Sequence, residues 1–203
     1  MKSTCRNAFS LVELLIALAI TGMLLAATMV ALDVSYKSYQ STTESASTNV
    51  VSRMVMHRVM GMIRTGTQFG PYPEDVLDPQ TNPVVSTSME FQSSYDEATS
   101  TSRITTLERR AHSDPERGPY ELWCVERVYV NGAQTNIQQY PLITGVRDVS
   151  FTLEYDVGPR LRRATVDITV SPNDFQDTKF DVNMDGPVIR LISSVQPRRI
   201  ASN

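Results

Sequence analysis

A run of 24 mostly apolar residues near the amino terminus constrains this chain more than any other feature. It extends from Phe9 to Leu32 and contains one charged residue, Glu13. About 20 apolar residues in a helix are enough to cross the hydrocarbon core of a bilayer, so the run predicts a membrane-spanning helix. A carboxylate at the centre of such a span costs roughly 2.5 to 3.5 kcal/mol, so Glu13 needs a partner or a protonated state. We therefore treat Glu13 as a candidate functional residue.

The flanks of the run predict its orientation. Residues 1–8 carry Lys2 and Arg6 and no acid, and positive residues stay cytoplasmic, which places the larger carboxyl-terminal part outside. A cleaved secretory signal is one alternative, with Ala26-Ala27-Thr28 as its cut site, but Glu13 and the full-span length argue against it. A plain single-span anchor is another alternative. It explains the length and the orientation but leaves Glu13 unexplained.

The residues from Asn7 to Leu18 closely resemble the prepilin leader junction of type IV pilins and type II secretion pseudopilins. The resemblance implies that a prepilin peptidase of the inner membrane cuts between Ala8 and Phe9 and methylates the new amino terminus on Phe9. Ala8 departs from the glycine that is usual in the family, although a small residue still fits there. Because cleavage leaves the apolar run in the mature protein, the leader would act as a processing tag and the helix as an anchor.

The resemblance makes Glu13 the fifth residue of the mature chain. Where apolar helices pack in a filament, a carboxylate at this place can approach the amino-terminal ammonium of a neighbouring subunit. Opposite charges in a low-dielectric bundle stabilise each other, whereas either charge alone is costly. Such a pair would set the axial register of an incoming subunit. The alternative is that Glu13 reaches the lipid headgroups from the first turn of the helix.

Beyond the membrane the sequence predicts a continuing helix that ends near Thr65-Gly66, followed by a β-rich head. We divide the chain into a leader (1–8), a transmembrane half-helix (9–32), an extramembrane half-helix (33–65) and a head (66–203). The fold class expected is α+β, a long amino-terminal helix packed on an antiparallel sheet as in pilins. Apolar residues spaced by three and four predict the packed stripe: Val51, Met54, Val55, Val59, Met62 and Ile63.

Short apolar runs and alternation predict the strands of the head. An extended connection is expected at Phe69 to Pro83, and polar loops at Tyr95 to Ser102 and Ala111 to Pro119. The predicted strands are Val84 to Gln92, Arg103 to Arg110, Glu121 to Val130, Val149 to Asp156, Leu161 to Val170 and Val188 to Val195.

The head is similar to minor pseudopilin J of type II secretion and to related large minor pilins. The similarity rests on Pro141 to Val146, the strand ending near Tyr155, Arg163 to Val170, and Leu191 to Arg199. It implies a minor subunit at the filament tip, with other pseudopilins, the prepilin peptidase and an inner-membrane assembly platform as partners, and with its head in the periplasm. A minor pilin of a type IV pilus, serving motility, adhesion or DNA uptake, is the alternative. A membrane-anchored enzyme or binding domain is an alternative of another class.

The charge balance gives no general attraction to nucleic acid. The chain has 19 basic and 22 acidic residues, a formal charge of −3, and loss of Lys2 and Arg6 with the leader makes it −5. Three basic pairs suggest a DNA-binding stripe, but their acidic neighbours favour a solvated face. These pairs are Arg109-Arg110, Arg162-Arg163 and Arg198-Arg199.

We expect no enzymatic activity, because no catalytic constellation is present in the sequence. His57 and His112 lie far apart, with no metal-binding spacing and no phosphate-binding loop nearby. Cys5 is lost with the leader, so Cys124 stays alone and is expected to be a buried strand thiol.

One segment of the head suggests a metal site. Asp181, Asn183, Asp185 and Gly186 match the first half of a calcium-binding loop, in which alternate oxygens converge on a hard cation. The twelfth position of the loop is Ile192 instead of an acid, so the bidentate ligand is missing. A polar turn before the last strand is the alternative, and we favour it. No other cofactor is expected.

Overall fold

The computed structural model describes residues 10–113, 119–158, 160–171 and 188–198. The chain divides into two units, Met1–Thr43 and Glu44–Asn203. One helix, α1 (Leu11–Thr65), contributes its first part to the first unit and its last part to the second. The sheet belongs entirely to the second unit, which we call the head. We describe the two units separately.

The predicted helix is present over 55 residues, and the structure shows what ends it. The amide of Gly66 donates to the carbonyls of Met62 and Ile63 at 3.0 and 3.2 Å, which closes the last turn. Gly66 is buried, and a Cβ built on it would lie 2.6 Å from Cδ2 of Phe91. Only glycine therefore lets the chain leave the helix this close to the core.

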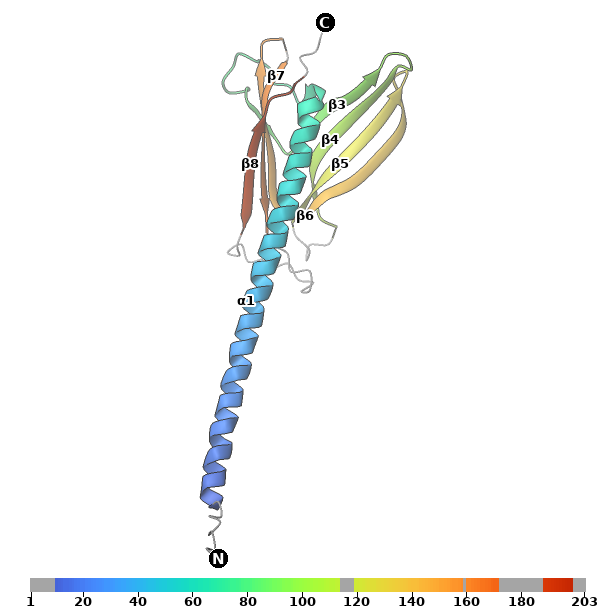
Figure 1. The fold of residues 1–203 in the computed structure, drawn as a ribbon. Helices are drawn as coiled ribbons and strands as arrows, with labels where there is room; N and C mark the ends of the chain where they lie inside the picture. The colour runs from blue at the N-terminus through green and yellow to red at the C-terminus, as the bar shows by residue number, and fades with distance from the viewer. Residues whose placement is uncertain (1–9, 114–118, 159, 172–187, 199–203) are drawn as a thin grey trace, which may run out of the picture. The chain divides into compact units, whose positions relative to one another are not determined.

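The described part of the head contains eight strands, and every pair of neighbouring strands is antiparallel. The order in the sheet is β1-β3-β4-β5-β6-β7-β8, with β2 pairing to β6 (Figure 1). The α+β fold class predicted from the sequence is thereby confirmed. The strands are β1 (Thr67–Gly70), β2 (Val84–Ser86), β3 (Ser88–Asp96), β4 (Thr101–Ala111), β5 (Tyr120–Val130), β6 (Ala133–Asp156), β7 (Arg160–Val170) and β8 (Ile189–Val195).

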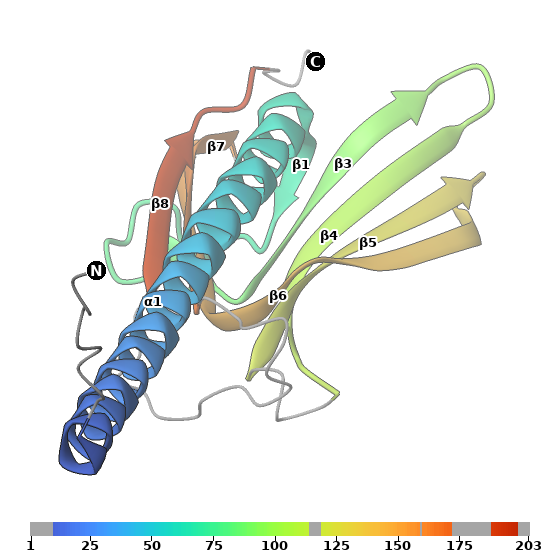
Figure 2. The same ribbon diagram turned by 60° about the horizontal axis from the view of Figure 1, so that its bottom comes forward.

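The head part of α1 lies across one face of this sheet, between β8 on one side and β3 and β4 on the other (Figure 2). Met56, Val59 and Ile63 are its buried apolar residues, and Thr48 and Ser52 continue the same stripe. The sequence placed Val51 and Met54 in the stripe, which is wrong, because they are 47% and 65% exposed. The buried stripe contains two hydroxyl residues, so hydrophobicity alone could not locate it.

Alternate side chains of the sheet form the other side of the core. Phe91, Leu107, Phe151 and Val166 are at most 1% exposed and come from β3, β4, β6 and β7. The alternation predicted for Val149 to Tyr155 is confirmed, since every second residue of this stretch is buried. Burial of apolar surface stabilises a fold by about 25 cal/mol per Å². This layer is therefore the main source of the head's stability.

Strand β6 is much longer than predicted and extends back to Ala133. The strand accommodates Pro141 and Gly145 through register shifts in its pairing with β5 and a positive φ of 68° at Gly145. The prediction was wrong in three further places. β1 was missed, the stretch Val84 to Gln92 is broken between β2 and β3, and the loop predicted from residue 95 to residue 102 is reduced to residues 97–100.

The connection between β1 and β2 is fastened to β6 by Asn82. Its Nδ2 donates to the carbonyls of Val76 and Tyr155 at 2.8 and 2.9 Å, and its Oδ1 accepts from the amide of Tyr155 at 3.0 Å. The hydroxyl of Tyr155 donates to the carbonyl of Pro71 at 2.9 Å. One side chain thus satisfies two backbone groups of β6 just before the start of β2.

Asn82→Ala is expected to destabilise the head by about 1 to 3 kcal/mol, because it leaves backbone groups of Tyr155 without partners. Urea unfolding of the full chain in detergent, followed by the fluorescence of its single tryptophan, measures the change. Asn136→Ala, an exposed asparagine of β6, is the matched control and should change stability by less than about 0.5 kcal/mol. Equal effects of the two substitutions would refute this role for Asn82.

Candidate functional site

Glu13 lies in the first turn of α1. The helix begins at Leu11, and the carbonyl of Ser10 accepts the first helical hydrogen bond from the amide of Leu14 at 3.2 Å. Glu13 is therefore the third residue of the helix, where unpaired backbone N–H groups and the helix dipole favour a negative charge. Its side chain is exposed and forms no hydrogen bond or ion pair within the described part of the chain.

The other polar side chains of the apolar segment are satisfied by the helix itself. Thr21 Oγ1 donates to the carbonyl of Ala17 at 2.6 Å, and Thr28 Oγ1 donates to the carbonyl of Leu25 at 2.9 Å. These bonds let both threonines enter an apolar environment at low cost. Within residues 11–32, Glu13 is consequently the one side chain with an unmet polar group.

The large apolar side chains of this segment are all exposed. Leu11, Leu18 and Met29 are examples, at 76%, 68% and 73%. The segment meets the length and composition expected of a membrane-spanning helix, and none of it is buried in the protein. So much exposed apolar surface requires lipid or other apolar helices around it.

A polar boundary follows the apolar segment along α1. Lys37 Nζ and Asp33 Oδ2 form an ion pair one helical turn apart, at 2.9 Å. Tyr36 and Tyr39 lie beside this pair and are exposed. Tyrosines and charges of this kind are typical of the membrane–water interface, and the end of the span after Leu32 stays a prediction.

The remaining predicted site residues lie outside the described residues. These are the cleavage and methylation positions Ala8 and Phe9 and the candidate calcium ligands Asp181, Asn183 and Asp185. Among the residues that the structure describes, no group of three or more His, Cys, Asp or Glu side chains is arranged to hold a metal ion.

A polar network between α1 and the sheet was not apparent from the sequence. Tyr140 Oη donates to Glu126 Oε1 at 2.8 Å and accepts from Arg58 Nη2 at 3.1 Å. Burial, and then hydrogen bonds with Cys124 and Glu126, raise the pKa of Tyr140 above its ordinary range. Cys124 is fully buried, which confirms the prediction of a buried strand thiol, and burial also raises its pKa. A thiol in this state is a poor nucleophile.

His112 forms a structural contact that was not apparent from the sequence. Its Nε2 lies 3.1 Å from Glu121 Oε1, and the two side chains are only 9% and 11% exposed. Glu121 Oε2 accepts a hydrogen bond from Trp123 Nε1 at 2.7 Å. The pair joins the end of β4 to the start of β5, so His112 belongs to the structure of the hairpin and not to a polar surface loop.

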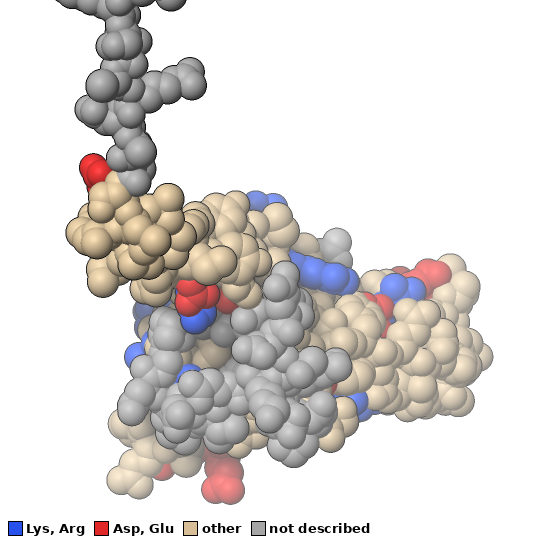
Figure 3. Space-filling view, turned by 90° about the horizontal axis from the view of Figure 1, so that it is seen from below, with Lys and Arg blue, Asp and Glu red and all other residues tan. Residues whose placement is uncertain are grey.

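Three arginines of the basic pairs in the sheet form ion pairs with acids of the sheet. Arg109 of β4 pairs with Asp148 of β6, Arg110 with Glu108 of the same strand, and Arg163 of β7 with Glu154 of the neighbouring β6. Basic and acidic residues are interspersed on the face shown in Figure 3. The solvated face that the sequence favours over a DNA-binding stripe stays a prediction.

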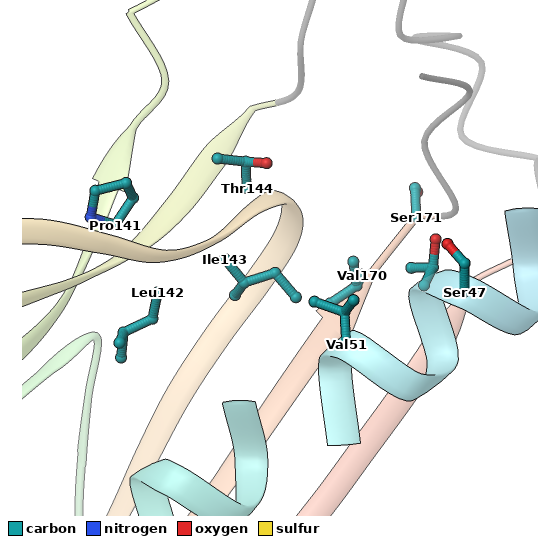
Figure 4. A pocket seen from close by; sticks show the side chains of 9 residues that line it. Ser47, Val51, Pro141, Leu142, Ile143, Thr144, Val170 and Ser171 are labelled. Atoms are coloured by element: carbon teal, nitrogen blue, oxygen red, sulfur yellow. The ribbon is translucent and has the colours of Figure 1, made fainter. Parts of the chain in front are cut away.

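A groove of about 240 Å³ lies where α1 meets the bend of β6. Val51, Ile143 and Val170 converge in it, with Ser47 and Ser171 at the rim (Figure 4). The exposure of Val51 is explained by this groove, because the helix and the sheet diverge there. Among the residues that the structure describes, no acid or base lines it.

Comparison with known proteins identifies the amino-terminal segment. The family model described as "Prokaryotic N-terminal methylation motif" matches residues 4–29, which include the predicted cleavage junction and Glu13. A comparison with curated proteins gave no significant match, and neither did one with solved structures. The chain thus carries a prokaryotic N-terminal methylation motif, which supports a type IV pilin-like protein anchored in a membrane by its amino-terminal helix.

Proposed function

We propose that this protein is a minor pseudopilin, similar to subunit J, of a type II secretion pseudopilus. A prepilin peptidase cuts it between Ala8 and Phe9 and methylates Phe9, and the helix then packs with other pseudopilins at an assembly platform in the inner membrane. The head stays in the periplasm and occupies the filament tip. Its function is assembly, without catalysis of its own.

One observation carries this proposal. The methylation motif extends into a helix whose only unmet polar group, within residues 11–32, is the carboxylate of Glu13. A plain membrane anchor requires only an apolar helix surface and no carboxylate within it. The carboxylate of Glu13 adds a charge that a positively charged amino terminus can neutralise, and cleavage before Phe9 creates such a terminus.

The mass and the amino-terminal sequence of the protein recovered from membranes test the proposal. Cells with and without a prepilin peptidase are compared. We expect a chain that begins at N-methylated Phe9 only when the peptidase is present. A chain beginning at Met1 in both would indicate a plain anchor, and one beginning beyond Ala26 would indicate a released protein. Either result would refute the proposal.

A minor pilin of a type IV pilus is the second candidate, because the same motif and helix serve both machines. Deletion of the gene distinguishes them. Loss of secreted proteins in the medium supports the pseudopilus, whereas loss of twitching, adhesion or DNA uptake supports the pilus. An anchored enzyme or binding domain would instead keep its function in a strain that lacks the prepilin peptidase.

Calcium binding at Asp181, Asn183 and Asp185 is tested separately, by thermal unfolding of the full chain in detergent. The turn interpretation, which we favour, predicts the same midpoint in millimolar Ca²⁺ and in chelator. A midpoint raised by Ca²⁺ in the unmodified chain, and not in the Asp181→Ala, Asp185→Ala variant, would show that calcium binds. Mg²⁺ at the same concentration controls for general ionic effects.

A further inference from the structure

The head part of α1 and the strand β8 enclose a polar groove of about 270 Å³. His57, Met60, Gly61 and Arg64 line it from the helix, and Ser193, Ser194 and Val195 line it from the strand. All of these residues belong to the head. The groove lies apart from the apolar groove of Figure 4, with which it shares no residue.

Arg64 gives the groove a positive charge, and no acid is among the described residues that line it. No Asp or Glu occurs between Glu44 and Glu74, a stretch that contains His57 and Arg64, and none occurs after Asp185. The nearest base on β8, Arg190, is held by Asp167 at 2.6 Å. Arg198 is joined to the helix end by its amide, which donates to the carbonyl of Arg64 at 2.8 Å.

The side chains that face the groove are available for binding. Within the described part of the chain, His57 and Arg64 form no side-chain hydrogen bond or ion pair, whereas Arg58 on the neighbouring face of the helix is bound to Tyr140. Ser193 contributes a further hydroxyl, while that of Ser194 is bound to Thr165 Oγ1 at 2.8 Å.

Gly61 keeps the floor of the groove open. A Cβ built on this residue meets no atom within 4 Å, so the glycine is not required by packing. Glycine inside a helix costs about 1 kcal/mol relative to alanine. Packing does not require a glycine at this position. Its lack of a side chain leaves space in the groove between His57 and Arg64, which a side chain of another protein can enter.

We propose that this groove binds carboxylate side chains of an acidic segment from another protein. The guanidinium of Arg64 offers a planar fork that matches a carboxylate, and His57 and Ser193 offer further donors. The volume accommodates one or two side chains and no folded element. The acidic balance of the whole chain opposes nucleic acid, whose charge extends far beyond a groove of this size. The proposal does not depend on the filament role proposed above.

The test uses the full chain in neutral detergent and a fluorescein-labelled peptide of six glutamates, with a peptide of six glutamines as the control. Fluorescence anisotropy is expected to show binding of the glutamate peptide at 20 mM salt, none of the glutamine peptide, and strong weakening at 300 mM salt. Arg64→Gln and Gly61→Gln are each expected to weaken binding threefold to tenfold. Gly61→Gln fills the groove without a clash and should not lower the thermal midpoint.

Arg53→Gln is the matched control, because it removes the same charge from the same helix. Arg53 is bound to Asn49 Oδ1 at 2.7 Å and does not line the groove. Unchanged binding in this variant, with weaker binding in the other two, supports the site. Equal weakening by Arg53→Gln and Arg64→Gln would indicate non-specific attraction and overturn the proposal. It would also be overturned if the glutamate peptide did not bind, or if inorganic phosphate alone bound at Arg64.

Discussion

Glu13→Ala is expected to reduce incorporation into filaments by about 100-fold or more while cleavage at Phe9 continues. Removing one partner of a buried ion pair costs about 3 to 5 kcal/mol, because the other charge stays buried and unpaired. About 1.4 kcal/mol corresponds to a factor of ten, so a loss of this size removes the variant from assembled filaments. The measurement compares processed protein in membranes with protein in sheared or purified filaments.

Two further variants separate the possible roles of Glu13. Glu13→Gln keeps a side chain that can cap the helix start but cannot pair with an ammonium group. We expect it to fail in assembly like the alanine variant. Normal assembly of the glutamine variant would show that Glu13 acts by capping, and normal assembly of the alanine variant would remove both roles.

Asp33→Ala is the control for loss of an acid from the same helix. Asp33 pairs with Lys37 beyond the apolar segment, where water screens both charges. Its replacement is expected to leave incorporation within about twofold of the unmodified chain. A loss as large as that of Glu13→Ala would mean that any acid of α1 affects assembly, and the argument from burial would fail.

Phe91→Ala is expected to destabilise the head by about 3 to 5 kcal/mol, the range for a fully buried phenylalanine. Phe91 is 1% exposed, and its ring lies 5.6 Å from that of Phe69 and directly against Gly66. It fills the corner where α1 ends and β1 begins. Loss of its ring therefore leaves a cavity between the helix and the sheet. The neighbouring Gly66 has no side chain to fill this cavity.

Thermal unfolding of the full chain in detergent checks this prediction. The midpoint is expected to fall by on the order of 10 °C. Tyr95→Ala is the matched control, because Tyr95 is an aromatic residue of the same strand that is 59% exposed. We expect it to shift the midpoint by less than about 2 °C. Similar shifts for both variants would show that the corner around Gly66 contributes little to stability.

Local signals in the sequence were sufficient for the main elements. The apolar run with Glu13, and the absence of proline before Pro71, predict a long helix, and α1 ends at Thr65, where the sequence predicts its end. Strict alternation in the second half of β6 likewise predicts a strand with one buried face. Such features depend on the backbone conformation of adjacent residues, which local side chains determine.

Other features depend on which segments meet, and only the tertiary structure decided them. The first half of β6 has no apolar alternation and is a strand because β5 pairs with it. The buried stripe of α1 includes Thr48 and Ser52, although Val51 and Met54 are more apolar. Contacts between the helix and the sheet determine which residues of α1 are buried, because the helix presents to the strands the side chains that fit against them.

The same division applies to the sites. The sequence by itself determined the amino-terminal motif and the isolated charge of Glu13, because both are properties of one continuous segment. The groove between α1 and β8 joins Arg64 to Ser193, and the network of Tyr140 joins three elements. Residues so distant in the chain come together only when the sheet order and register are fixed, and the identities of neighbouring residues do not specify that order.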